Sequence, residues 1–380
     1  MSQEIEIGLG KKGRLAYSLD DVSIVPSRRT RDPQDVSTSW QVDAYEFDVP
    51  VIGAPMDSVT SPATAIAMGK MGALGVLDLE GLWTRYDDPQ PLLDEIAELP
   101  AESATERIQQ IYAEPIKPEL IVERLHEIRD AGVTVAGALS PQRTQDYYST
   151  VLEAGVDLFV IRGTVVSAEH VSQDHEPLNL KKFIYDLDVP VIVGGAANYT
   201  AALHLMRTGA AGVLVGFGGG AVSANRNTIG VHAPMATAIA DVAEARRDYM
   251  DESGGRYVQV IADGGMGDSG SFIKAFALGA DAVMLGSPLA RAEEAPGKGM
   301  QLGCRSPSSD ASARLPHERR HRRHPGRYHV RPQPQCGRHH QLHWRAPSCH
   351  GNHRLCRSQE LPALPGHGRS GPLNELCGKA

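Results

Sequence analysis

The chain has 380 residues, of which 41% are hydrophobic and 39 are glycine, which suits one large domain or two of ordinary size. No apolar run approaches the roughly 18 residues of a transmembrane helix. The acidic start at residues 1–6 lacks the apolar core of a signal peptide. We therefore expect a cytoplasmic protein with no membrane partner.

The net charge is −8, but charge is distributed unevenly along the chain. Residues 301–380 carry 14 Lys and Arg against four Asp and Glu, and they hold all five cysteines and ten of the fifteen histidines. Two compositions therefore meet near Met300. We expect one structured domain over residues 1–300 and a separate basic tail over residues 301–380.

Short apolar runs recur along the first 300 residues. They are continuous rather than alternating, which is typical of strands buried on both faces of a parallel sheet. Eight such runs are present, at residues 50–54, 73–77, 134–138, 157–161, 190–194, 211–215, 258–262 and 281–285.

Helical patterns lie between these runs, and several end at a glycine directly before the next strand. The patterns cover residues 60–71, 92–99, 104–112, 121–131, 200–208, 235–249 and 270–277. A glycine C-cap followed by a buried strand is a repeated αβ unit. Eight such units predict a (β/α)8 TIM barrel, and an open parallel sheet is the less favoured alternative.

The sixth strand leads into a loop in which four of the five residues 216–220 are glycine. Three interpretations compete: a flexible connector, a dinucleotide-binding turn with the pattern G-x-G-x-x-A over residues 216–221, and a substrate loop of a barrel. The dinucleotide fingerprint needs a helix to begin at its last small residue. Residues 222–230 read as a long loop instead, so the pattern favours the substrate loop.

Two glycine turns follow the seventh and eighth strands: Asp263-Gly264-Gly265 and Gly286-Ser287. Backbone N–H groups at such turns attract a phosphate, and Ser287 adds a hydroxyl. Asp263 is only an acceptor at neutral pH and suits ribose hydroxyls. The alternative is a pair of tight turns in which Asp caps a helix. Because the turns belong to adjacent units, we favour a phosphate site.

These stretches resemble the IMP dehydrogenase/GMP reductase family, and the similarity runs along most of residues 14–300. Residues 20–26 look like the family's N-terminal strand, and the loop at 215–226 falls on its catalytic loop. The other matching segments are residues 54–59, 68–76, 261–265 and 279–294. The connection at 78–133 is too short for the regulatory CBS pair, so the chain resembles the short branch of the family.

The resemblance implies a purine mononucleotide as ligand (IMP, XMP or GMP) and oxidation of IMP to XMP with NAD in GMP biosynthesis. It implies that the phosphate binds at Gly264, Gly265, Gly286 and Ser287, that Asp263 binds the ribose, and that Met56 lies near the base. It also implies a homotetramer, a catalytic residue at position 223, and a potassium ion on the catalytic loop. The matching positions for potassium are Gly218, Gly220 and Ser223.

Several residues depart from the family pattern in the half of the site that carries the redox chemistry. Ser223 occupies the position of the nucleophilic cysteine, and no His or Lys lies within five residues of it to activate the hydroxyl. The family's later flap is not recognisable. The other departures are Ala221 for serine, Asn225 for threonine, Arg162 in place of an aspartate and Gly195 for asparagine, while Arg226 is retained. We therefore expect this chain to lack IMP dehydrogenase activity.

Two other functions stay open within the resemblance: reduction of a purine nucleotide with NADPH, and nucleotide binding without catalysis.

The tail has three interpretations. Its Cys and His residues fit no zinc-finger spacing well, and its basic charge is a weak indication of nucleic-acid binding. We favour an out-of-frame, disordered tail and expect no nucleic-acid partner, since back-translation of residues 301–306 with one base dropped yields Asn-Trp-Gly-Ala-Glu, which resembles the family's continuation.

Overall fold

The computed structural model describes residues 4–26, 32–163, 166–168, 178–217, 219–220, 225–228 and 230–302. Eight parallel strands close into a barrel with the order β10-β11-β12-β5-β6-β7-β8-β9. They are β5 (Val51–Gly53), β6 (Leu74–Asp78), β7 (Ala136–Leu139), β8 (Leu158–Arg162), β9 (Val191–Ala196), β10 (Gly212–Val215), β11 (Gln259–Asp263) and β12 (Ala282–Leu285). All eight predicted strands and the predicted TIM barrel are confirmed.

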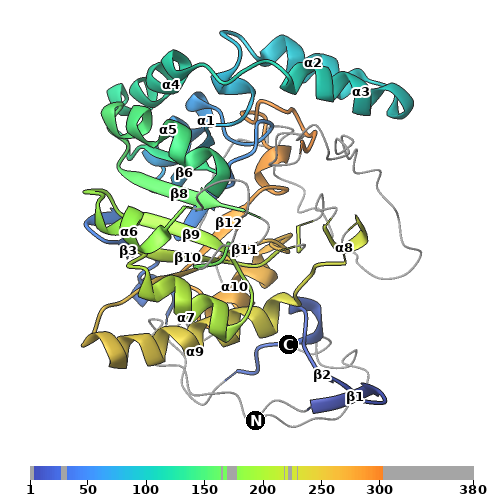
Figure 1. Ribbon diagram of the computed structural model, residues 1–380, viewed down its shortest axis with the longest axis vertical. Coiled ribbons are helices and arrows are strands. Elements are labelled where there is room, and N and C mark those ends of the chain that lie inside the picture. The colour runs from blue at the N-terminus through green and yellow to red at the C-terminus, as the bar shows by residue number, and fades with distance from the viewer. Residues whose placement is uncertain are drawn as a thin grey trace.

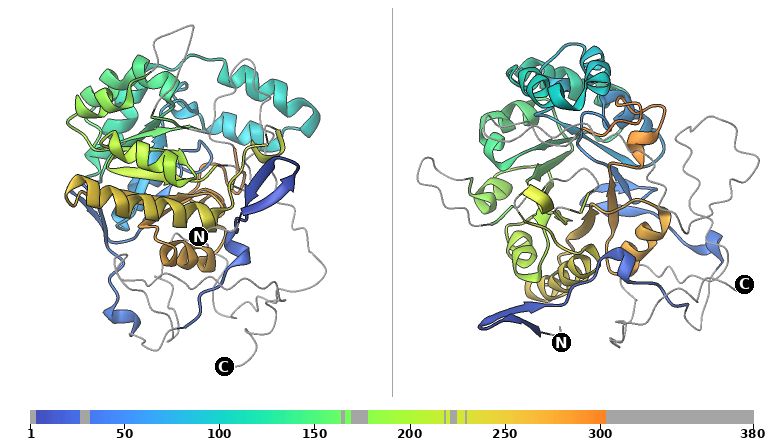
Figure 2. Two further views of the ribbon diagram at one scale, coloured as in Figure 1. Left: turned by 60° about the horizontal axis from the view of Figure 1, so that its bottom comes forward. Right: turned by 90° about the vertical axis from the view of Figure 1, so that its right-hand side faces the viewer.

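Helices surround the barrel, as Figures 1 and 2 show. They are α1 (Pro62–Lys70), α4 (Pro118–Asp130), α5 (Pro141–Glu153), α6 (Leu180–Tyr185), α7 (Tyr199–Arg207), α9 (Met235–Ser253) and α10 (Ser269–Ala277). Side chains cap several N-termini: Asn198 accepts from the N–H of Ala201 at 2.8 Å, and Asp268 accepts from Ser271 at 2.8 Å. Gly209 and Gly279 have φ of +98° and +110° directly after their helices, as the predicted C-caps require.

The main core lies inside the barrel and between the strands and the helices. The strands are buried on both faces, with Val76, Leu158 and Phe159 at 0% exposure, which agrees with their continuous apolar sequences. Small residues let α1 approach the sheet closely: a Cβ on Gly75 would lie 2.5 Å from Cα of Ala65. Packing of this kind holds the strand ends, and therefore the loops between them, in fixed positions.

Two helices form a separate layer beyond the barrel, α2 (Gln90–Glu98) and α3 (Ala101–Tyr112), as predicted for the long connection after β6. In Figure 1 they lie apart from the helical ring. Together with the short 3-10 helix η3 (Leu82–Thr84), they enclose a second cluster of buried side chains. Met300 and Leu302 from the end of the described chain complete this cluster.

Some elements differ from the predictions. The predicted strand at residues 20–26 is wrong: Leu19–Asp21 form the 3-10 helix η1, and residues 22–26 pair with no strand in the described part of the chain. The loop predicted at 222–230 contains a one-turn helix, α8 (Asn225–Thr228). Helix α6 and two further short 3-10 helices, η2 (Pro33–Asp35) and η4 (Leu289–Arg291), were not predicted. For α5, the sequence indicated only its end, at the glycine of residues 154–156.

Two antiparallel hairpins precede the barrel and were also not predicted. One is β1 (Glu4–Gly8) with β2 (Lys11–Arg14), and the other is β3 (Trp40–Val42) with β4 (Tyr45–Phe47). Figure 2 shows the first hairpin extending away from the barrel. Among the described residues, no helix combines the length and the hydropathy that crossing a membrane requires.

Candidate functional site

The two glycine turns lie side by side at the carboxyl ends of neighbouring strands. Asp263, the last residue of β11, pairs in register with Met284 of β12. Gly264 and Gly265 follow Asp263 with φ of +109° and +77°, conformations that glycine adopts without strain. The structure thus brings Asp263, Gly264 and Gly265 next to the turn at residues 286–287, as the sequence predicted.

Met56 reaches the same place from the loop after β5. It is buried, and a Cβ on Gly286 would lie 3.1 Å from its sulfur. The backbone joins the two segments as well, because the N–H of Ala54 donates to the carbonyl of Leu285 at 3.0 Å. The predicted contact residue for the purine base therefore lies directly beside the predicted phosphate turn.

The glycine loop after β10 contacts the turn after β11. A Cβ on Gly264 would lie 3.1 Å from the backbone nitrogen of Gly220. Gly218 and Ser223, the other predicted potassium positions, lie outside the described residues, as does the predicted catalytic role of Ser223. Among the residues the structure describes, no three His, Cys, Asp or Glu side chains gather as a metal site.

Asp263 forms an ion pair that the sequence did not predict. Nε and Nη2 of Arg162, at the end of β8, donate to its Oδ2 at 3.1 and 2.9 Å. Both side chains are largely buried, with 19% and 15% exposure. Oδ1 accepts no hydrogen bond from the described part of the chain, so this oxygen can accept one from a ligand.

Gly195 shows why the family's asparagine does not fit this backbone. A Cβ at that position would lie 2.4 Å from the carbonyl oxygen of Gly216. The end of β9 therefore touches the start of the glycine loop directly. This close approach leaves no room for a side chain at position 195.

Ser287 already has a partner in the folded chain. Its hydroxyl donates to Oε1 of Gln301 at 3.0 Å, and Gln301 is 2% exposed. The adjacent Leu302 donates its N–H to Oγ of Ser58 at 2.9 Å. Because a hydroxyl has one proton, Ser287 must turn away from Gln301 to donate to a phosphate.

Asp57, next to Met56, is a buried carboxylate with its own set of partners. It accepts from the hydroxyl of Tyr112 on α3 and from the N–H of Leu82 at 2.7 Å. Burial raises the pKa of Asp57 to about 6, while these bonds and the charge of Arg85 limit the rise. A Cβ on Gly81 would lie 2.1 Å from its carboxylate, so glycine is required there. These contacts fix the loop that carries Met56.

His232 is a polar residue near the glycine loop, and no pattern in the sequence predicted a role for it. Its Nδ1 is buried and has no hydrogen-bond partner among the residues that the structure describes. The neighbouring backbone is tied to both ends of the loop, since Val231 donates to the carbonyl of Asn225 and Ala233 donates to that of Phe217. A buried ring nitrogen without a partner is uncommon in folded proteins, and here it lies in the segment that follows β10.

The closed barrel, with glycine turns, a carboxylate and a hydroxyl gathered at the carboxyl ends of its strands, has the architecture of a (β/α)8-barrel enzyme. Residues 16–309 match the model of the IMP dehydrogenase/GMP reductase domain. The match covers well over half of the chain. The chain therefore belongs to the IMP dehydrogenase/GMP reductase family of oxidoreductases.

Relatives and a solved structure agree with this assignment. An uncharacterized oxidoreductase of Mycolicibacterium smegmatis is 52% identical over 78% of this chain and 80% of its own length. The inosine-5'-monophosphate dehydrogenase of Thermoplasma acidophilum is 28% identical over 76% of this chain and 75% of its own length. The crystal structure of an IMP dehydrogenase/GMP reductase-like protein from Corynebacterium glutamicum has a TM-score of 0.78 and 49% identity, covering 83% of this chain and 84% of that one.

Proposed function

We propose that this chain binds a purine mononucleotide, with IMP as the first candidate, at the carboxyl ends of the barrel strands. The observation that supports this most is the adjacency of the two glycine turns with Asp263 and Ser287 beside them. In this proposal the phosphate lies on Gly264, Gly265, Gly286 and Ser287. Backbone N–H groups and a hydroxyl suit a dianion.

The ribose and the base take the remaining groups. Asp263 offers Oδ1 to a ribose hydroxyl while Arg162 holds Oδ2. Two charged donors on the same carboxylate oxygen restrict the orientation of the carboxylate, so Arg162 acts as a positioning residue for Asp263. Met56 lies against the purine. The hydrogen bonds of the adjacent Asp57 with Leu82 and Tyr112 hold the loop that carries Met56.

The reaction we propose for the family site is oxidation of IMP and water to XMP, with NAD as hydride acceptor and release of NADH and a proton. When bound, potassium would lie on carbonyls at Gly218, Gly220 and Ser223. A serine hydroxyl without a nearby base is a poor nucleophile. We therefore propose that the chain binds IMP but does not oxidise it, because Ser223 replaces the nucleophile. We further propose that it is a cytoplasmic homotetramer.

Binding and turnover are tested separately on the full chain. Titration calorimetry with IMP should show saturable binding at one site per chain, and a coupled assay with IMP and NAD should show no NADH. Absence of IMP binding would overturn the proposed site. Steady NADH production would overturn the proposed suppression, and oxidation of NADPH in the presence of GMP would identify a reductase instead.

A further inference from the structure

A pocket lies at the other end of the barrel from the proposed nucleotide site. It has a volume of about 550 Å³ and lies among α6, the end of α7 and the end of α9. Gly209 and Arg256, which line it, precede β10 and β11 in the chain, whereas Asp263 is the last residue of β11. The pocket therefore opens at the amino ends of the strands.

The lining of this pocket is cationic. Lys181, Lys182, Arg207 and Arg256 contribute to it, and no Asp or Glu occurs among the described residues that line it. This contrasts with the acidic balance of the chain as a whole, whose net charge is −8. A concave surface lined by one sign of charge concentrates ligands of the opposite sign.

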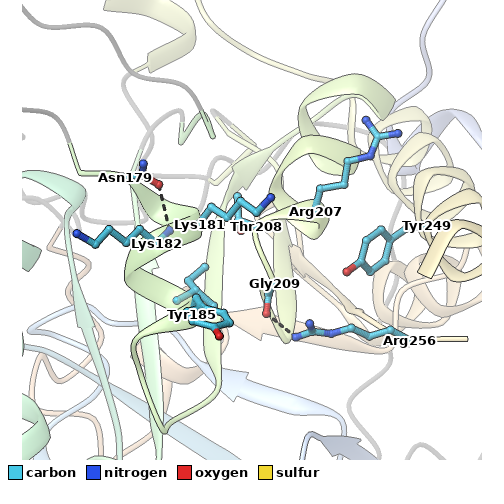
Figure 3. Close-up of a pocket in the computed structure, with 10 residues that line it drawn as sticks. Asn179, Lys181, Lys182, Tyr185, Arg207, Thr208, Gly209, Tyr249 and Arg256 are labelled. Atoms are coloured by element: carbon cyan, nitrogen blue, oxygen red, sulfur yellow. Dashed lines mark hydrogen bonds between the residues drawn. The ribbon is translucent and has the colours of Figure 1, made fainter. Parts of the chain in front are cut away.

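The four cations are not equally available. Arg207 is paired with Glu252 at 2.9 and 2.6 Å, and Arg256 donates to the carbonyl of Gly209 at 2.5 Å. Lys181 and Lys182 make no ion pair within the described part of the chain. Figure 3 shows Lys181 directed across the pocket toward Arg207, whereas Lys182 is directed away from it.

Two tyrosines at the pocket add a hydroxyl and an exposed aromatic ring, which a ligand can contact. Tyr249 is 8% exposed, and its hydroxyl, on the side of Gly209 in Figure 3, has no hydrogen-bond partner among the described residues. Tyr185 is 87% exposed at the edge of the pocket. An exposed ring beside a charged pocket provides a flat surface for stacking.

We propose that this pocket binds a nucleoside polyphosphate, at a site distinct from the proposed IMP site. Lys181 and Arg256 would contact the phosphates, because ammonium and guanidinium groups are the usual protein partners of phosphate oxygens. The hydroxyl of Tyr249 donates a further hydrogen bond, and Tyr185 stacks on the base. The volume lies within the range of roughly 300–1,000 Å³ that is usual for small-molecule sites.

ATP serves as the probe, titrated into the full chain at physiological ionic strength. Lys181→Ala should weaken ATP binding about tenfold or more, as loss of a charged hydrogen bond does. Lys182→Ala is the matched control, since it removes the same charge from the neighbouring residue and should change the affinity less than about threefold. Inorganic pyrophosphate should bind at the same site more weakly than ATP, and adenosine should not bind measurably.

Competition with IMP separates the two sites. ATP affinity should be unchanged in saturating IMP and in the Ser287→Ala variant, and IMP affinity should be unchanged in Lys181→Ala. Equal losses of ATP affinity in the two lysine variants, displacement of ATP by IMP, or no ATP binding would each overturn the proposal. Unchanged IMP binding also shows that the lysine variants are folded, so that these outcomes concern this pocket alone.

Discussion

Asp263 and Ser287 are the side chains on which the proposed nucleotide contact depends most. Ser287→Ala should weaken IMP binding by about 1–2 kcal/mol, since one hydrogen bond to a charged group is lost. Asp263→Ala should weaken it further, because the ribose loses its acceptor and the ion pair of Asp263 with Arg162 is lost. Titration calorimetry with IMP measures both, and unchanged affinity in both variants would show that the site is misplaced.

The ion pair complicates the second variant, because a guanidinium that has lost this carboxylate changes the charge balance of the site. Asp263→Ala in an Arg162→Ala background resolves this. If Asp263 contacts the ribose, its removal still weakens IMP binding when Arg162 is absent. If the loss disappears in that background, the role of Asp263 is only to neutralise Arg162.

Position 223 decides whether the covalent route of the family can begin. A thiol is a few per cent ionised at neutral pH and is strongly nucleophilic, whereas a serine hydroxyl is not ionised. Ser223→Cys should restore at most the first half-reaction, seen as a single-turnover burst of NADH without steady turnover. Rapid-mixing absorbance measurements test this. Steady turnover by the unmodified chain would mean that the loop uses another nucleophile or transfers hydride without a covalent adduct.

Sequence reasoning located the residues of the two turns because glycine and Asp directly after buried strands have a local signature. It missed the partners that come from far along the chain. Gln301 contacts Ser287, and Tyr112 contacts Asp57 across 55 residues. Such contacts depend on how loops fold over the barrel, which no local pattern encodes. Arg162 was noted as a departure, but its pairing with Asp263 was not predicted.

At the scale of elements, the loop after β5 and helix α3 are coupled through Asp57 and Tyr112. The pKa of Asp57 is raised from 3.8 to about 6 by burial. Between these values the folded protein keeps a proton that the unfolded chain has released. The stability from this group is therefore complete below about pH 4 and is lost as the pH rises through about 6, by up to about 3 kcal/mol.

Asp57→Asn should remove this pH dependence. The amide can accept from Leu82 N–H and donate to the Tyr112 oxygen, so packing is kept. Denaturant unfolding at pH 4 to 8 should show a smaller fall in the free energy of unfolding for the variant than for the parent. Tyr112→Phe removes a bond that lowers the pKa of Asp57, so it should shift the fall to higher pH. Parallel pH profiles for all three proteins would contradict the assignment.

Elements with a continuous apolar sequence or a clear helical period were predictable, and those with neither were not. Every barrel strand is buried and was found. Helix α5 buries only Thr144 and Val151, too few for a clear helical period. The hairpin of β1 and β2 is almost fully exposed, so burial leaves no pattern in its sequence. The strand expected at residues 20–26 has no partner in the described structure to bond its backbone.

For the whole molecule, the barrel and the layer of α2 and α3 are joined through the segment at residues 300–302. Met300 and Leu302 are 8% and 3% exposed in the second cluster, and Leu302 also bonds Ser58 in the loop after β5. The segment thus reaches both the α2–α3 layer and, through Gln301 and Ser287, the proposed phosphate site. The family match ends close by, at residue 309.

We predict that the basic tail proposed as out of frame adds little to the stability of the barrel, whereas this segment adds much. A chain ending after Leu302 should unfold at the same temperature as the full chain. A chain ending after Gly299 loses two buried apolar side chains, each worth about 1.5–3 kcal/mol, and leaves the Ser58 hydroxyl without its backbone donor. Its thermal midpoint, measured by circular dichroism, should fall clearly below the other two. If both shortened chains are equally destabilised, residues beyond 302 stabilise the folded barrel. That result would contradict the prediction that the tail adds little.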